Sequence, residues 1–158
     1  MTPLPFPALH ASHSGIWIAD THGTRRVGRG EAVGRAAETP TLLLNAPLVA
    51  QRLGYPELSG LDLLELFAFV HPARFMVPTA KGLATVLGLA TPADEAATAE
   101  LLRDAAATLI AELGRSDWTE REGGWNSAVT LQRLRWAWGA TVTAAIARPA
   151  EAERGLFA

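Results

Sequence analysis

Carboxylates are the side chains whose spacing in this 158-residue sequence comes nearest to a catalytic set. Asp20 ends the apolar segment 15–20, Asp62 and Glu65 lie three residues apart, and Asp94 precedes a segment rich in alanine and leucine. Nucleases that use two metal ions hold them with several carboxylates from separate segments, and the metals contact the attacking and leaving oxygens of a phosphodiester. These four acids define one candidate chemistry, which is metal-dependent cleavage of nucleic acid.

Each of these acids also has a structural interpretation. Asp20 opens the segment Asp-Thr-His-Gly23, which has the composition of a tight turn. Asp94 lies near the start of an expected helix, where a carboxylate accepts hydrogen bonds from free backbone N–H groups. Asp62 and Glu65 could share one helix face as solvent-exposed acids. The residues alone leave both interpretations open, and the structural one requires no metal.

Several other classes of chemistry lack the residues that they need. The chain contains no cysteine, which excludes disulfides, cysteine zinc sites, iron–sulfur clusters and a thiol nucleophile. No serine stands in a Gly-x-Ser-x-Gly nucleophile elbow. Lys81 is the only lysine, and its neighbours do not form a phosphate-binding P-loop. The segment 28–34 superficially resembles a dinucleotide loop, but it follows a short expected hairpin, so we predict a loop and a helix start there.

The basic residues do not indicate a binding site for a polyanion, and the histidines do not indicate a metal site. Lys and Arg number 14 against 16 Asp and Glu, and the formal net charge is −2. The four histidines lack the spacing that fixes a metal, so we predict that they lie on the surface: His10, His13, His22 and His71. No secretory signal and no membrane-length apolar segment is present, so we expect a soluble, cytoplasmic protein with no membrane partner.

Tryptophan and arginine alternate in the last third of the chain. Such interleaving could stack on unpaired bases, and it predicts nucleic-acid or docking contacts at four positions: Trp125, Arg133, Arg135 and Trp136. The favoured interpretation is that Trp138 and its helical neighbours dock this segment on another domain, because burying a tryptophan removes a large apolar area from water.

The elements that would position these residues alternate between strand and helix patterns. Residues 1–14 are rich in proline and are expected to form a loose arm, and 15–20 and 24–27 are expected to form a hairpin. The apolar segment 41–44 has the pattern of a strand buried on both faces, and Asn45 caps the helix expected after it. This strand–helix unit predicts an α/β class.

The later elements are expected to be helical, with apolar stripes at helical spacing. Thr91 is the expected cap of the longest helix, and a strand start is possible at 61–63. The expected helices span 61–70, 80–87, 92–113 and 127–147, with a polar linker at 116–124. The expected organisation is an arm at 1–14, an α/β domain at 15–115 and a linker with a helix at 116–158. The apolar end Gly155-Leu-Phe-Ala158 favours the front part of a longer protein.

Three segments resemble, in order, the motifs of DnaQ-like exonucleases, which have the ribonuclease-H-like fold. In that family, the first motif is Asp-x-Glu on the first strand, often followed by Thr and Gly. Ile18-Ala-Asp-Thr-His-Gly23 is similar to it, Leu44-Asn-Ala-Pro-Leu-Val49 to the second motif, and Asp94 through Leu102 to the third. The resemblance implies a small ribonuclease-H-like sheet, built from an N-terminal hairpin and a buried strand, packed with several helices and followed by a C-terminal helical segment.

The departures from the family pattern concern the metal ligands. Ile18 and Val49 stand where the resemblance implies aspartates, and Leu89 stands where it implies the histidine general base. Asp20 and Asp94 remain as vestigial motif positions. Two acids hardly neutralise two divalent ions, so we expect neither a catalytic residue nor a metal site in this chain.

A second resemblance is to the N-terminal region of bacterial DinG-like, XPD-related helicases. The segments 63–75, 78–79, 82–84 and 136–157 carry it. It implies a non-catalytic accessory domain of an ATP-dependent DNA helicase active in DNA unwinding and repair. The motor, with its ATP and Mg²⁺, would then lie beyond Ala158, and the partners would be that motor and single-stranded DNA.

Two alternatives stay open. One is a divergent metal-dependent 3′–5′ exonuclease that uses the four acids Asp20, Asp62, Glu65 and Asp94. The other is a protein-interaction module with no nucleic-acid role, which the net charge of −2 favours because phosphate contacts need clustered Arg or Lys.

Overall fold

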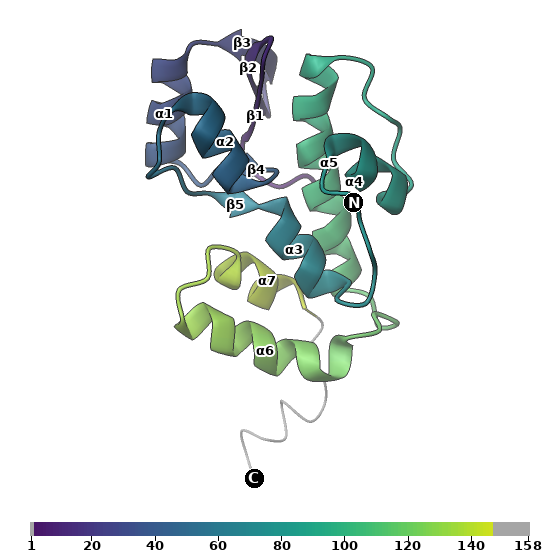
Figure 1. The fold of residues 1–158 in the computed structure, drawn as a ribbon. Coiled ribbons are helices and arrows are strands. Elements are labelled where there is room, and N and C mark those ends of the chain that lie inside the picture. The colour runs from purple at the N-terminus through teal and green to yellow at the C-terminus, as the bar shows by residue number, and fades with distance from the viewer. Residues whose placement is uncertain (1, 147–158) are drawn as a thin grey trace.

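The sheet of this protein is mixed, and its central strand is the first in the chain. The computed structural model describes residues 2–146 (Figure 1). The strands are β1 Ala8–Ser12, β2 Gly15–Asp20, β3 Gly23–Val27, β4 Leu42–Leu43 and β5 Leu61–Asp62. Their order across the sheet is β3-β2-β1-β4-β5. β1, β2 and β3 pair antiparallel, whereas β4 runs parallel to β1 and β5 runs parallel to β4.

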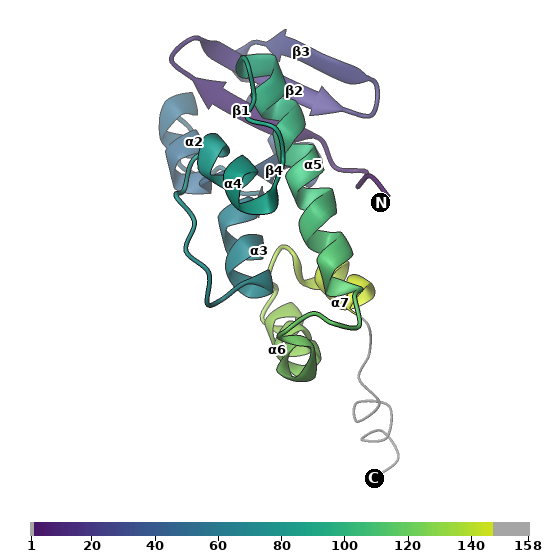
Figure 2. The same cartoon turned by 90° about the vertical axis from the view of Figure 1, so that its right-hand side faces the viewer.

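Helices cover both faces of this sheet. They are α1 Arg29–Glu38, α2 Ala46–Leu53, α3 Leu63–Val70, α4 Ala80–Leu87, α5 Glu95–Leu113, α6 Arg121–Arg133 and α7 Gly139–Ala145. α1 and α2 lie on one side of the strands, and α4 and α5 lie on the other (Figure 1). α5 packs against β1, β2, β3 and β4 and extends from the sheet to α7 (Figure 2). This arrangement confirms the predicted α/β class and the C-terminal helical segment, and it is consistent with the predicted ribonuclease-H-like sheet.

The alternation of side chains along β1 explains why both faces are covered. Leu9 and Ala11 point to the core under α1 and α2, and Ala8 points to the core under α3 and α5. Successive side chains of a strand point to opposite faces, so a strand in the middle of the sheet needs an apolar partner on each side. His10 therefore faces α5, on the same side as Ala8.

The prediction of a loose arm at 1–14 is wrong for Ala8–Ser12. These residues form β1, and Ala8 and Leu9 are almost completely buried. Ala8 pairs with Ala19 of β2 on one side and with Leu42 of β4 on the other. The prolines end at Pro7, immediately before the strand, and pairing on both sides overrides the weak strand preference of Ala-Leu-His-Ala-Ser.

The hairpin and the first strand–helix unit agree with the prediction. β2 has its predicted bounds, and β3 follows it after a turn opened by Asp20. Asn45 caps α2, because its side-chain oxygen accepts a hydrogen bond from the Leu48 N–H group at 3.3 Å. The buried strand at 41–44 is shorter than predicted, since only Leu42–Leu43 pair in the sheet.

Two helix predictions need correction. α5 starts at Glu95 rather than at Pro92, and its cap is Asp94, whose side chain accepts a hydrogen bond from the Ala97 N–H group at 2.7 Å. A carboxylate at the cap, next to the positive end of the helix dipole, outweighs the threonine–proline signal at Thr91.

The last helix is the second correction. Instead of one helix at 127–147, the chain forms α6 and α7, and α6 begins inside the segment expected as a linker. Arg135 has a φ of 65°, in the left-handed region, which breaks the helix between them. The predicted helix end at Ala147 and the apolar end Gly155–Ala158 lie outside the described residues.

Asp62 joins the parts of the fold. Its carboxylate is 5% exposed and accepts hydrogen bonds from the N–H groups of Asn45 at 3.0 Å, Ala46 at 2.8 Å and Leu64 at 3.0 Å. Its backbone carbonyl accepts a fourth hydrogen bond, from the indole N–H group of Trp138 at 2.9 Å. One buried residue thus connects the start of α2, the start of α3 and the C-terminal helices.

Replacing Asp62 should destabilise the fold more than replacing an exposed acid. Asp62→Ala leaves three backbone N–H groups without their acceptor, so we expect the free energy of unfolding to fall by about 3 kcal/mol or more. Asp104 is exposed on α5, and Asp104→Ala should change it by less than about 0.5 kcal/mol. Urea denaturation monitored by tryptophan fluorescence measures both values, and equal losses in the two variants would contradict this role of Asp62.

Within residues 2–146, no helix combines the length and the hydropathy that crossing a bilayer requires.

Candidate functional site at the carboxyl ends of β1 and β4

A cavity of about 190 Å³ lies where the parallel strands β1 and β4 end. The end of β1 contributes His10, the start of α2 contributes Asn45 and Val49, and α2 and α5 contribute Arg52 and Thr98. In open α/β sheets, ligands bind outside the carboxyl ends of parallel strands. The topology therefore marks this cavity as the candidate site.

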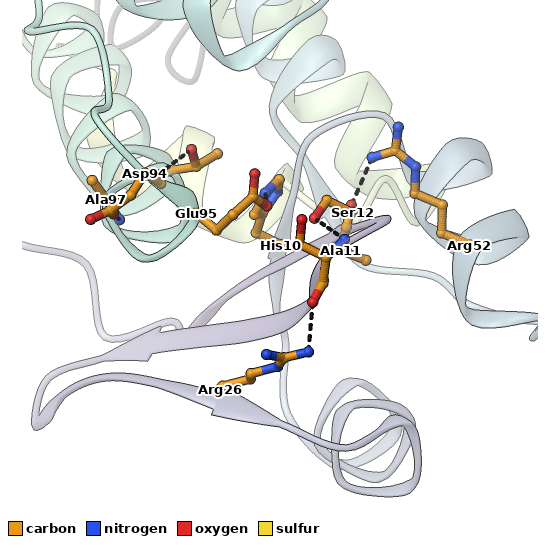
Figure 3. A network of polar contacts seen from close by, with 10 residues as sticks. His10, Ala11, Ser12, Arg26, Arg52, Asp94, Glu95 and Ala97 are labelled. Carbon is orange, nitrogen blue, oxygen red and sulfur yellow. Dashed lines mark hydrogen bonds and ion pairs between the residues drawn. The ribbon is translucent and has the colours of Figure 1, made fainter.

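His10, which lines this cavity, forms an imidazole–carboxylate pair with Glu95. His10 Nε2 and Glu95 Oε2 are 2.7 Å apart, which joins β1 to the first turn of α5 (Figure 3). A hydrogen bond from the Ser12 side chain lowers the pKa of Glu95; partial burial opposes this, and His10 and Arg52 lower it further. The His10 ring also stacks on Trp17 of β2, with centroids 6.1 Å apart. The ionised carboxylate of Glu95 thus already has its hydrogen-bond partners within the chain.

Arginines hold the backbone around the end of β1. Arg52 Nη1 donates a hydrogen bond to the Ala11 carbonyl at 2.7 Å, and Arg26 Nη2 donates one to the Ser14 carbonyl at 2.6 Å (Figure 3). Arg52 belongs to α2 and lines the cavity. Its guanidinium places a permanent positive charge at the carboxyl end of the central strand.

The structure does not bring Asp20 to this site. Asp20 lies at the far end of β2, where its carboxylate accepts a hydrogen bond from the His22 N–H group at 2.8 Å, which lowers its pKa, and faces Arg35 at 3.7 Å. Its backbone carbonyl accepts from Arg103 at 3.0 Å. Arg103 lies eight residues after Glu95 on α5, or about 12 Å along the helix axis.

The other three acids also have structural partners. Asp94 is close to Glu95 but is exposed and caps α5, and the Asp62 carboxylate is occupied by backbone N–H groups. Glu65 Oε1 accepts a hydrogen bond from the Trp136 indole at 2.8 Å. The structural interpretation of Asp20 as a turn opener and of Asp94 as a capping acid is confirmed. In the part of the chain that the structure describes, no three histidine or acidic side chains gather as a metal-binding group.

The three apolar residues that stand at expected ligand or base positions, Ile18, Val49 and Leu89, lie in different parts of the structure. Val49 lines the cavity and is 5% exposed. Ile18 is buried on β2 against the core under α1 and α2, and Leu89 packs, half-buried, on the core around α3 and α5. Only Val49 of the three is therefore a side chain of this cavity.

Sequence reasoning missed four residues of this site, which are His10, Ser12, Arg52 and Glu95. His10 and Ser12 lie on β1, which the proline-rich start of the chain concealed. Their spacing to Gly15 is the same as the spacing of Ile18 and Asp20 to Gly23, so local spacing alone does not single them out.

The prediction of surface histidines is correct for His13 and His22 and wrong for the other two. The side chains of His10 and His71 are 18% and 15% exposed, and they pair with Glu95 and Glu112, respectively. Each pair joins residues far apart in sequence, which local spacing does not reveal.

The tryptophans dock the C-terminal helices, as the favoured interpretation predicted, but on α3 and β5 of the same chain. Trp138 is completely buried, and the Trp118 indole donates a hydrogen bond to the Val70 carbonyl at 2.9 Å. Trp136 packs on Phe69, with ring centroids 5.4 Å apart. Trp125 packs, half-buried, against the same core.

Arg133 and Arg135 are the members of the predicted contact set that lie fully on the surface. Both are exposed where α6 ends and the chain turns toward α7. The structure therefore separates the predicted set into two packed tryptophans and two exposed arginines.

Comparison with family models, with curated proteins and with solved structures gives no match to this chain.

Removing the Ser12 hydroxyl should raise the pKa of Glu95 toward its ordinary value, because the largest interaction that lowers it is lost. Carbon-13 NMR titration of the side-chain carboxyl groups in Ser12→Ala measures this shift. Glu31, whose pKa is lowered by Arg25, should titrate as before. An unchanged Glu95 would contradict the assigned hydrogen bond.

The sign of the effect on stability follows from the direction of the shift. A carboxyl group with a lowered pKa stabilises the fold above its unfolded-state pKa, and this contribution disappears as the pH falls through the folded-state pKa. Ser12→Ala should therefore have a lower free energy of unfolding than the parent chain near neutral pH. In acid, the difference between the two free energies should disappear.

Proposed function

We propose that this chain is a non-catalytic accessory domain of an ATP-dependent DNA helicase, built on a nuclease-like fold whose site no longer cleaves. The observation that supports this is the set of side chains at the ends of β1 and β4. The cavity there is lined or flanked by the His10–Glu95 pair, the Arg52 guanidinium and the Val49 side chain. In this proposal, these side chains stand where a two-metal nuclease would need carboxylates.

The side chains at this site do not fit a pair of divalent ions. Mg²⁺ and Mn²⁺ prefer oxygen ligands, and carboxylates offset their charge. The two carboxylates that contact the cavity lining already have partners: Glu95 is held by His10 and Ser12, and Asp62 by backbone N–H groups that include that of Asn45. Arg52 adds a positive charge that would repel a cation from the same place.

In this proposal, the motifs correspond to the chain differently from the expectation based on sequence alone. The first motif matches His10 and Ser12 on β1, in place of Ile18 and Asp20 on β2. The second retains Asn45 as a helix cap, with Val49 one helical turn later, and the third retains Asp94 as the cap of α5. The motif residues that are kept are those with a structural role, and the positions that would only bind metal carry other residues.

The role that remains is to position a partner, and the C-terminal helices support it. The burial of Trp138 and its hydrogen bond to Asp62 give α6 and α7 a defined place on the domain. In this proposal the helicase motor follows beyond Ala158 in the same polypeptide and carries ATP and Mg²⁺. Single-stranded DNA is the second proposed partner, through the exposed Arg133 and Arg135.

The chain should not degrade DNA. We expect end-labelled single-stranded DNA to stay intact during incubation with the purified chain and Mn²⁺. The matched variant is Asp94→Asn, which removes the charge but keeps a cap oxygen for the Ala97 N–H group, so the helix start is preserved. Degradation by the parent chain that disappears in Asp94→Asn would overturn the proposal in favour of the divergent exonuclease.

The link to a helicase is tested in the coding sequence. We expect the reading frame to continue after the codon for Ala158 into a motor region with Walker motifs, because the DinG-like resemblance implies an N-terminal position. Sequencing the downstream DNA decides this. A stop codon at that place, with no neighbouring motor gene, would contradict the helicase part of the proposal and leave the nuclease result unaffected.

A further inference from the structure

A second concave surface lies between the loop 71–79 and α4, and unlike the cavity at the sheet edge it contains no histidine or arginine among the described residues of its wall. This groove has a volume of about 340 Å³, and Phe75, Met76, Val77 and Val86 form most of its wall. Phe75 is 84% exposed and Val77 is 51% exposed, which is unusual for large apolar side chains. We propose that the groove binds a segment of a partner protein that inserts an apolar side chain flanked by carboxylates.

Contacts with α4 fix the backbone of the loop that carries Phe75. The Arg74 guanidinium donates a hydrogen bond to the Val86 carbonyl at 2.9 Å, which joins the loop to the last turn of α4. At the other end of the loop, a Cβ atom on Gly82 would lie 2.1 Å from the Val77 carbonyl oxygen, so only glycine lets the loop lie this close to α4. A side chain presented in this way binds with little ordering cost.

The charges around the groove favour an acidic partner. From residue 66 to residue 93 the chain has no aspartate or glutamate, although it has 16 in total. Lys81 is the charged side chain in the groove wall, and Arg74 lies beside Val86 at its edge. The charged side chain in the groove wall is therefore a cation, and carboxylates on a partner would complement it.

The polar groups in the groove favour an apolar side chain over a nucleic-acid base. The Thr79 hydroxyl accepts a hydrogen bond from the Gly82 N–H group at 3.0 Å, and the Thr85 hydroxyl donates one to the Lys81 carbonyl at 2.9 Å. Apart from Lys81, the polar side chains of the groove wall are thus engaged within the chain, so a base buried here would leave most donors and acceptors of its edge without partners, which costs free energy. An aliphatic or aromatic side chain carries no such groups, and Phe75 would be its principal contact.

The test uses two synthetic peptides with the same central leucines, one flanked by glutamates and one by lysines. They are titrated into the isotope-labelled chain, and amide chemical shifts are followed by NMR. We expect the acidic peptide to shift the amides of Phe75, Val77, Gly82 and Thr85, and the lysine peptide to leave them unchanged.

Three variants identify the surface. Phe75→Ser should weaken binding of the acidic peptide about tenfold or more, since it removes the central apolar contact. Lys81→Glu should reverse the preference, so that the lysine peptide binds and the glutamate peptide does not. Leu134→Ser, at an apolar residue that is 73% exposed elsewhere, should bind as the parent chain does. Phe75 and Lys81 have exposed side chains, so both variants should fold, and their unchanged amide spectra verify this.

Several outcomes would overturn the proposal. One is that neither peptide shifts the groove amides. Another is that oligothymidylate shifts them while the acidic peptide does not, which would make the surface a nucleic-acid contact. A third is self-association of the parent chain in sedimentation experiments that Phe75→Ser abolishes, which would make the occupant a second copy. None of these outcomes depends on whether the chain cleaves DNA.

Discussion

The buried carboxylate of Asp62 is the interaction on which the arrangement of this protein depends. It accepts hydrogen bonds from backbone N–H groups at the starts of α2 and α3, and its own carbonyl anchors Trp138. A buried charge is tolerated only when hydrogen bonds surround it, so each of these segments is constrained to meet at one point. This constraint fixes where β4 and β5 end and where the C-terminal helices pack. It therefore also fixes one wall of the candidate site.

Side-chain contacts hold together the elements that form the site at the sheet edge. The His10–Glu95 pair joins β1 to α5, and Arg52 joins β1 to α2. These contacts fix the positions of α2 and α5 relative to the carboxyl end of the central strand. The Arg52 guanidinium therefore places a positive charge on the cavity wall, and the Glu95 carboxylate is already paired with His10.

The sequence predicted the elements that have strong local signals. Asn45 and Asp20 act as cap and turn residues where their positions indicated, because these signals act over three or four residues. β1 was missed because its five residues have weak strand preference and gain their stability from pairing with β2 and β4. The contact between His10 and Glu95 spans 85 positions, and no local pattern reports it.

Composition and local pattern by themselves determined the α/β class, the hairpin, the capped helix after the buried strand and the exclusion of thiol chemistry. The tertiary structure alone decided which residues share a site: it placed Asp20 away from Glu95, put His10 and Ser12 at the end of the central strand, and covered Trp138 while it left Phe75 exposed. The reason is physical. Caps and turns are stabilised by neighbours along the chain, whereas burial and ion pairing depend on which elements the sheet order brings together in space.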